Sequence, residues 1–226
     1  MKVLAIIPAR GGSKTLIGKN IKNLSGKPLI IWTLEAAKKS KFINEIVVST
    51  DSDEIKKVVS DFGFDCKLLR PPHLALDTTT SYEVIKYELA NRNGFDIVCM
   101  LQPTSPLRNS NDIDTAFDFF QSKNATSCVS VYQIEDVPYW TFTLSENGFL
   151  SPLFSKNYFS KRRQELDDVY TLNGAIYISR IDDYLINKGF ISNRTLPFVM
   201  TIDRSVDIDT IEDFELAEKY LNLNKK

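Results

Sequence analysis

The first half of this chain alternates short apolar runs with amphipathic stretches, and this alternation restricts the possible folds more than any other feature. Apolar runs that suit strands buried on both faces lie at 3–8, 45–50, 66–69, 96–101 and 127–132. Helical patterns between and after them lie at 28–37, 53–62, 81–91 and 112–122. A strand–helix rhythm of this kind predicts an α/β fold with a mostly parallel, doubly wound sheet and helices on both faces.

The rhythm breaks between Gln133 and Asp168. Residues 139–144 alternate between apolar and polar types, the pair Asn147-Gly148 predicts a tight turn, and an apolar run resumes after it. We therefore expect one domain over 1–226, with a small β-hairpin subdomain inserted at about 133–170. The α/β pattern returns afterwards, with strands expected at 175–179 and 198–202 and a last helix at 209–221.

Composition excludes several classes of function. The chain has 28 Lys and Arg against 29 Asp and Glu, a net charge of −1, which argues against a nucleic-acid or acidic-membrane partner. The single histidine, His73, rules out multi-histidine metal sites, and it reads as structural rather than catalytic. Three widely spaced cysteines fit buried apolar positions in a reducing compartment. No segment resembles a signal peptide or a membrane span, so we expect a cytoplasmic protein.

A basic, glycine-containing loop follows the first expected strand, at the sheet edge where ligands bind in such folds. It includes Arg10, Gly11, Gly12, Ser13, Lys14, Lys19 and Asn20. The glycines allow successive backbone N–H groups to point at an anion, and the three cationic side chains favour an oligophosphate. The loop is not a Walker A motif, because Ser13 and Asn20 stand where that motif needs Gly and Ser or Thr. The alternative is a solvated basic loop whose glycines serve only the turn.

Two carboxylates near the other end of the chain form a second candidate site. In extended chain, Asp207 and Asp209 point to the same side, and paired carboxylates suit Mg²⁺. The alternative is that Asp209 and Glu212 form a capping box at the start of a helix. That alternative explains Asp209 but leaves Asp207 without a role.

Two further side chains suit a polar organic ligand. Gln102 follows the expected strand at 96–101 in a loop stiffened by prolines, and its amide can bind a base or a sugar hydroxyl. The alternative there is a plain turn, with Ser110 capping the next helix. Arg163 can bind a carboxylate through two hydrogen bonds, although a solvated charged face also explains the run 161–163.

Taken together, these motifs resemble the acylneuraminate cytidylyltransferases, also called CMP-sialic acid synthetases. The resemblance covers Pro8 to Asp213 and is carried by 7–14, Lys19-Asn20, 70–81, 102–108, 173–177 and 207–209. It implies a nucleotide-binding sheet and transfer of CMP from CTP to the anomeric hydroxyl of a nine-carbon 2-keto acid sugar, with release of pyrophosphate. It also implies dependence on Mg²⁺ and a homodimer built through the inserted hairpin.

The resemblance also implies roles for individual residues. Nucleotide binding falls to Arg10, Gly11, Gly12, Ser13, Lys14, Lys19, Asn20, Arg70 and Ser81. The sugar site falls to Gln102, Arg163, Tyr177 and Phe190. Asp207 and Asp209 would hold the metal, and together with Lys19 they would be the catalytic residues.

The chain departs from the family pattern in two places. Thr15, Ile17 and Gly18 occupy a stretch where the family often has Gly, Pro and Arg. Where some members place a lysine after the proline of the insertion, this chain has Tyr139-Trp140, and an aromatic there favours a less hydroxylated sugar such as legionaminic acid.

Two other functions remain as alternatives. A cytidylyltransferase acting on the eight-carbon acid Kdo predicts a different basic loop, typically without the Lys-Asn pair. A non-catalytic nucleotide-sugar binding module predicts that the two aspartates only cap a helix.

Overall fold

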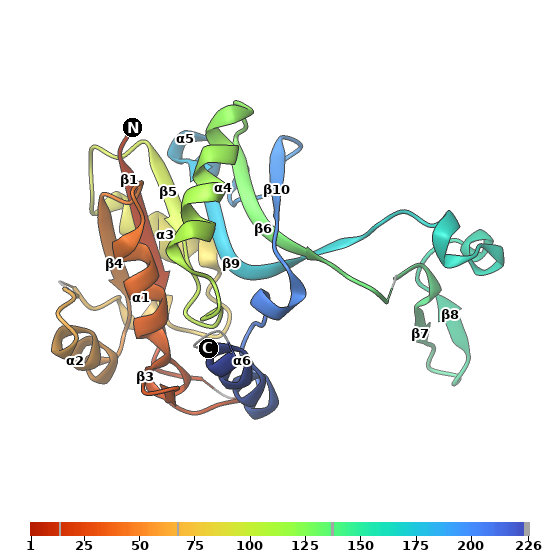
Figure 1. Ribbon diagram of the computed structural model, residues 1–226, viewed down its shortest axis with the longest axis horizontal. Helices are drawn as coiled ribbons and strands as arrows, with labels where there is room; N and C mark the ends of the chain where they lie inside the picture. The colour runs from red at the N-terminus through yellow and green to blue at the C-terminus, as the bar shows by residue number, and fades with distance from the viewer. Residues whose placement is uncertain (14, 67, 137, 224–226) are drawn as a thin grey trace.

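A computed structural model describes residues 1–13, 15–66, 68–136 and 138–223. Its core is a six-stranded sheet in the order β10-β6-β9-β5-β1-β4 (Figure 1). The strands are β1 (Val3–Pro8), β4 (Glu45–Ser49), β5 (Ile97–Met100), β6 (Ser127–Gln133), β9 (Tyr170–Arg180) and β10 (Thr195–Val199). β9 runs antiparallel to both of its neighbours, and the other pairings are parallel. The expected mostly parallel sheet is confirmed.

Helices cover both faces of the sheet, because alternate residues of the buried strands supply two separate cores. Ala5 and Ile7 pack with α1 (Leu29–Lys39), α2 (Asp53–Asp61) and α4 (Ser110–Ser122). Leu4 and Ile6 pack on the other face, against α3 (Ser81–Ala90) and α5 (Ile181–Asn187). A third cluster joins α6 (Ile211–Leu223) to the segment around Leu24 and to the loop after β5. The doubly wound arrangement expected from the sequence is thus present.

Several boundaries differ from the sequence expectations. The strand expected at 66–69 is wrong: its described residues form a loop beside β4, where the Cys66 thiol contacts the Val48 carbonyl at 3.5 Å. Lys67 of that segment lies outside the described residues. The strand expected at 198–202 is β10, which begins at Thr195, and the α5 helix was not expected. Asn109 rather than Ser110 caps α4, through a capping box with Asp112.

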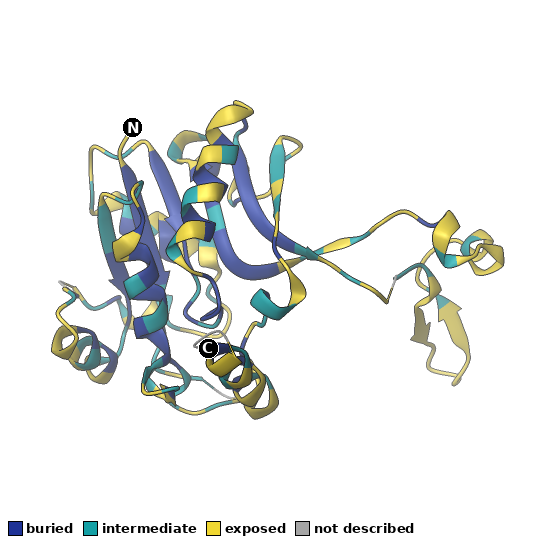
Figure 2. Ribbon diagram, viewed as in Figure 1, coloured by how far each residue is buried: buried dark blue, intermediate teal, exposed yellow. Residues whose placement is uncertain are grey.

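The insertion between β6 and β9 forms an arm, defined here as residues 134–169, which projects from the body (Figure 1). A hydrogen bond from the Ile134 amide to the Val169 carbonyl continues the β6–β9 pairing into its base. β7 (Phe142–Leu144) and β8 (Leu150–Pro152) form the expected hairpin. Most of the arm is exposed (Figure 2), and it includes large apolar side chains: Leu144 is 73% exposed and Phe149 is 74% exposed.

The remaining elements are short. They are β2 (Asn23–Leu24) and β3 (Lys27–Pro28), with single turns at Lys19–Ile21, Pro72–Leu74, Pro138–Trp140, Lys156–Ser160, Arg163–Glu165 and Ile202–Arg204. Cys66, Cys99 and Cys128 are free and buried, as expected. Among the helices of the described residues, none combines the length and apolarity that crossing a bilayer requires.

Candidate active site

Two cavities open at the carboxyl ends of β1 and β5. The first, called the loop cavity, measures about 290 Å³ and is lined by Pro8, Arg10, Ser13, Thr15, Lys19, Asn20, Gln102, Pro103, Thr104 and Asp209. The second, called the α3 cavity, also measures about 290 Å³ and is lined by Pro8, Arg10, Arg70, the segment 74–77, Thr79, Ser81 and Val84. Pro8 and Arg10 border both cavities, so a single extended ligand can occupy the two together.

The basic loop is held in place by contacts that leave Arg10 at the boundary between the cavities. The Asn20 side-chain amide, nearly buried, donates to the Arg10 carbonyl at 3.1 Å. The Gly11 amide donates to Asp51 at 3.0 Å, and a Cβ at Gly11 would lie 2.9 Å from the Ser52 Cβ. This close approach explains why the position requires glycine. The Arg10 guanidinium itself forms an ion pair with Asp77 at 2.6 Å.

The other members of the predicted basic loop differ in how they are placed. Ser13 lines the loop cavity with Lys19. Gly12 is exposed, with open space where a side chain would stand. Lys14 lies outside the described residues.

Lys19 joins the basic loop to the acidic pair near the other end of the chain. Its Nζ donates to the Asp209 carboxylate at 2.9 Å and to the Ile208 carbonyl at 2.6 Å, across a separation of 190 positions for the Asp209 contact. The two motifs that the sequence singled out therefore meet in space, which is the central geometric result for this site.

Asp209 does not cap α6, so the capping-box alternative with Glu212 is wrong. The capping box is made by Thr210 and Asp213: Asp213 accepts from the Thr210 amide at 2.9 Å, and its own amide donates to the Thr210 hydroxyl at 3.3 Å. Because its neighbour performs the capping, the Asp209 carboxylate is left facing the loop cavity, with 72% of its side chain exposed.

Asp207 is open to solvent on one side, yet the surrounding protein desolvates its carboxylate. This desolvation raises the pKa of Asp207 above its usual value, the negative charge of Asp209 adds to the rise, and a hydrogen bond from the Thr104 hydroxyl opposes it. The Ile208 amide also donates to the Thr104 carbonyl at 2.8 Å. Thr104, in the loop after β5, thus holds the segment of the acidic pair through both its side chain and its backbone carbonyl.

Gly174 allows Gln102 and Asp207 to approach each other over β9. It has a φ of +76°, and a Cβ there would lie 2.3 Å from the Gln102 Oε1 and 3.4 Å from the Asp207 Oδ2. The register of β6 against β9 shifts at this point, between Val129 and Val131. The preceding residue, Asn173, is buried and stabilises this register shift. Its side-chain oxygen accepts from the Ser130 hydroxyl at 2.6 Å, and its side-chain nitrogen donates to the Ser205 hydroxyl at 2.9 Å.

Arg70 and Ser81 belong to the α3 cavity. Arg70 is 4% exposed, its Nη2 lies 3.7 Å from Asp51, and its Nε has no hydrogen-bond partner among the described residues. Burial lowers the pKa of Arg70, and the nearby Asp51 charge opposes that change. Ser81 is the first residue of α3, after a capping box formed by Thr80 and Glu83.

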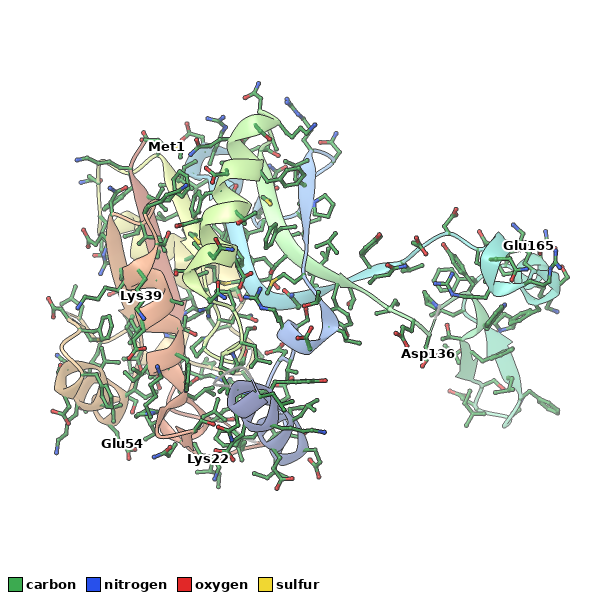
Figure 3. The ribbon with its side chains drawn as sticks, in the orientation of Figure 1. Met1, Lys22, Lys39, Glu54, Asp136 and Glu165 are labelled. Carbon is green, nitrogen blue, oxygen red and sulfur yellow. The ribbon has the colours of Figure 1, made fainter. Side chains whose placement is uncertain are left out.

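The predicted sugar-site residues fall into two groups. The Tyr177 ring lies 5.4 Å from that of Phe190 between centroids, and burial, followed by the charge of Asp207, raises the pKa of the Tyr177 phenol. Gln102 joins this group over Gly174. Arg163 instead lies on the arm, 3.6 Å from Asp168. Figure 3 labels Glu165, in the same turn as Arg163, far from the body. A single chain does not bring Arg163 to the other three.

Thr104, Asp51 and Asp77 also belong to this site, although sequence reasoning assigned them no role. Thr104 stood in the proline-rich loop already selected for Gln102. Asp51 directly follows the strand expected at 45–50, so the rule that ligands bind beyond strand ends pointed to it. His73 is exposed and has no contact that suggests catalysis.

The acidic pair fits Mg²⁺ by its donor chemistry. Within the described ranges there is no cluster of three or more His, Cys, Asp or Glu side chains able to hold a metal by themselves. Mg²⁺ is usually held by one or two carboxylates together with substrate phosphates and water. Asp207 and Asp209, next to a cationic loop, match that pattern.

Comparisons with known proteins show which proteins this chain is similar to. A family model described as cytidylyltransferase matches residues 4–226. The N-acylneuraminate cytidylyltransferase of Streptococcus agalactiae serotype V is 38% identical over 95% of this chain but only 52% of its own length. The CMP-N,N'-diacetyllegionaminic acid synthase of Legionella pneumophila is also 38% identical, over 100% of this chain and 99% of its own length.

A solved structure shares the fold. CMP:2-keto-3-deoxy-manno-octonic acid synthetase complexed with CTP has a TM-score of 0.74 and 19% identity, and the match covers 99% of this chain and 100% of that one. The chain thus spans about half the length of the Streptococcus relative and nearly the whole length of the Legionella relative.

Proposed function

Because this chain belongs to the cytidylyltransferase family, we propose that it transfers CMP from CTP to the anomeric hydroxyl of a nine-carbon 2-keto acid sugar, an N-acylneuraminate, with release of pyrophosphate. The observation that carries the proposal is the contact of Lys19 with Asp209, since both side chains line the loop cavity and so join the cationic loop to the acidic segment. The names of the relatives support both the nucleotide and the class of sugar.

The two cavities suit the two halves of CTP. The loop cavity, with Arg10, Ser13 and Lys19, would take the triphosphate, and the α3 cavity, with Arg70 and Ser81, would take the nucleoside. Arg10 borders both and would lie near the phosphate that joins them. The sugar would lie over Gly174, against Gln102 and Tyr177.

In this proposal each side chain has a defined role. Asp207 and Asp209 would hold Mg²⁺, which when bound lowers the pKa of a hydroxyl and neutralises phosphate charge. Lys19 and the loop amides would stabilise pyrophosphate as it leaves. Gln102 would orient the sugar by donating and accepting hydrogen bonds. The lone histidine has no part in the chemistry.

The arm would form a homodimer and complete the sugar site of its partner. Exposed apolar surface of the kind that the arm carries marks interaction sites, and Arg163 on the arm is too far from the other sugar-site residues of its own chain. In a dimer, the arm of one chain would lie over the body of the other. On this view 1–226 is one domain, and the insertion serves dimerisation and the sugar site.

One alternative substrate has specific support. A deoxy sugar such as legionaminic acid is favoured by the Legionella relative, which matches this chain over its whole length. The aromatic pair of the insertion does not add to that support. Tyr139 stacks on Tyr158 at 4.6 Å between ring centroids, and the Trp140 indole N–H donates to the Tyr158 carbonyl at 3.0 Å, so both pack within the arm.

Pyrophosphate release tests the proposal. The purified protein is incubated with Mg²⁺ and each of CTP, ATP, GTP and UTP, against a panel of N-acetylneuraminate, N,N'-diacetyllegionaminate and Kdo. We expect release only with CTP and a nine-carbon acid. CTP binding without release for any acid would instead support a non-catalytic module. A strong preference in kcat/KM for N-acetylneuraminate would exclude the deoxy alternative, and a preference for Kdo would refute the substrate class.

A further inference from the structure

Four aromatic side chains form a continuous column behind the proposed sugar site. The ring centroids of Tyr177 and Phe190 lie 5.4 Å apart, those of Phe190 and Tyr184 4.7 Å, and those of Tyr184 and Tyr82 5.7 Å. Tyr177 belongs to β9, Tyr184 to α5 and Tyr82 to α3. Distances of this size are typical of favourable aromatic pairs.

Tyr184 is the central and most enclosed member of the column. It is 1% exposed, compared with 7% for Phe190. The start of its helix is tied to the residue before β5, because the Ile181 amide donates to the Asp96 carbonyl at 3.0 Å, and the helix ends with a local bond from the Gly189 amide to the Tyr184 carbonyl at 3.1 Å. The Tyr184 ring therefore has a fixed position relative to the sheet and offers a rigid surface to Phe190.

The outer end of the column reaches the helix that borders the α3 cavity. Tyr82 follows Ser81 at the start of α3, and Ser81 and Val84 line that cavity. One face of the first turns of α3 thus borders the cavity assigned to the nucleoside. Tyr82 reaches from the same turns into the aromatic column.

We propose that Tyr184 is a positioning residue for the sugar, acting through the rings of Phe190 and Tyr177 without touching substrate. The inference rests on the proposed function, because it takes Tyr177 and Phe190 as the sugar-facing pair. Removing the Tyr184 ring leaves these two side chains without the surface that fixes them. The affinity for the sugar falls, while the phosphate-binding and acidic groups stay in place.

The test compares Tyr184→Leu with Tyr184→Phe and with Phe117→Leu. Phe117 is a matched control because it is fully buried and stacks on Phe42 at 5.1 Å, but it lies in the core on the opposite face of the sheet. We expect Tyr184→Leu to raise the KM for the sugar roughly tenfold, with kcat and the Kd for CTP changed less than twofold. Tyr184→Phe restores the wild-type KM, and Phe117→Leu leaves it unchanged despite a similar loss of thermal stability.

A second readout does not depend on activity. The aromatic NMR resonances of Tyr177, whose ring pairs with Phe190 and not with Tyr184, shift in Tyr184→Leu and stay in place in Phe117→Leu. If Tyr184→Leu fails to fold, Tyr82→Leu at the edge of the column gives a smaller rise in the sugar KM and smaller shifts. Equal effects of Tyr184→Leu and Phe117→Leu, or unmoved resonances, overturn the inference. An inactive wild-type protein whose resonances still shift refutes the proposed function and the role in sugar binding together, and leaves only the packing of Phe190 and Tyr177 by Tyr184.

Discussion

Replacing Gly174 by alanine tests the geometry of the site most directly. The residue has a φ of +76°, and the new Cβ would lie 2.3 Å from the Gln102 Oε1 and 3.0 Å from the Ser105 hydroxyl. The side-chain amide of Gln102 must retreat by about 1 Å to reach ordinary contact, and a misplacement of that size in a positioning group can lower a rate about 10²-fold. Asp207, 3.4 Å from the same Cβ, can stay in place.

Gly63 provides a matched control, because its φ is +77° but a Cβ there meets nothing within 4 Å. In both alanine variants the left-handed backbone conformation lowers the free energy of unfolding by about 1–2 kcal/mol. In a chain of this size that corresponds to a fall in Tm of about 2–8 °C. The steric displacement of Gln102 belongs to Gly174→Ala alone.

The assay is pyrophosphate release at saturating CTP across a range of sugar concentrations, with Tm from a thermal scan. We expect both variants to lose stability through the left-handed backbone, and Gly174→Ala to lose more because its Cβ also clashes with Gln102. Gly174→Ala alone should lose about two orders of magnitude in kcat/KM for the sugar. If Gly174→Ala keeps kcat/KM within twofold of Gly63→Ala, then Gln102 is not held at the sugar by this glycine, and the convergence of groups over β9 has no functional meaning.

Three further predictions concern carboxylates and the arm. Asp207→Asn should lower turnover by roughly 10²–10⁴-fold and leave CTP binding without metal unchanged. Because the pKa of Asp207 is raised in the folded protein, ionisation of this carboxyl opposes folding. Asp207→Asn should therefore be more stable than wild type at a pH above the usual carboxyl pKa, and the difference should disappear in strong acid. Urea unfolding at several pH values measures this difference. Asp77→Asn removes the charge that competes with phosphate for Arg10, while its amide oxygen can still accept from Arg10 and hold it in place. CTP binding should therefore tighten about two- to fivefold by calorimetry, with Asp61→Asn as an unaffected control; weaker binding would contradict this. Leu144→Asp on the exposed hairpin should shift sedimentation from dimer to monomer, and an unchanged dimer would exclude the hairpin from the interface.

Sequence patterns located the buried strands well but did not give the direction of β9. An apolar run inside a sheet looks the same whether the strand is parallel or antiparallel, because both of its faces are buried. Direction depends on the connections, and here the long arm before β9 replaces a helical crossover. The α5 helix was not predicted, because its seven residues are too few to show a helical period in the sequence.

The site was foreseen in parts rather than as an assembly. Local chemistry made Lys19 a candidate for phosphate binding and Asp209 a candidate for metal binding, but no local pattern states that they touch. The contact depends on the path of the chain after β10. That segment runs back along the loop after β5, where the Ile208 amide donates to the Thr104 carbonyl, and so reaches the loop after β1. The position of Arg163 could not be predicted from the sequence either, because a pattern of charges does not show that its segment projects from the body.

The contacts around the basic loop also explain how a chain with a net charge of −1 can suit a polyanion. In the structure the two cationic side chains of the loop that are described are already paired with carboxylates: Arg10 with Asp77 and Lys19 with Asp209. If the loop binds the triphosphate as we propose, these carboxylates occupy the places of phosphate oxygens and hold the side chains in position before the ligand arrives. Binding then exchanges one set of anions for another instead of ordering a free loop, which lowers the entropic cost of assembling the site. The net charge of the chain argues against a long polyanion such as a nucleic acid, because such a ligand needs a broad basic surface. It says nothing against a compact one, because recognition then depends on a few cations whose partners can be displaced.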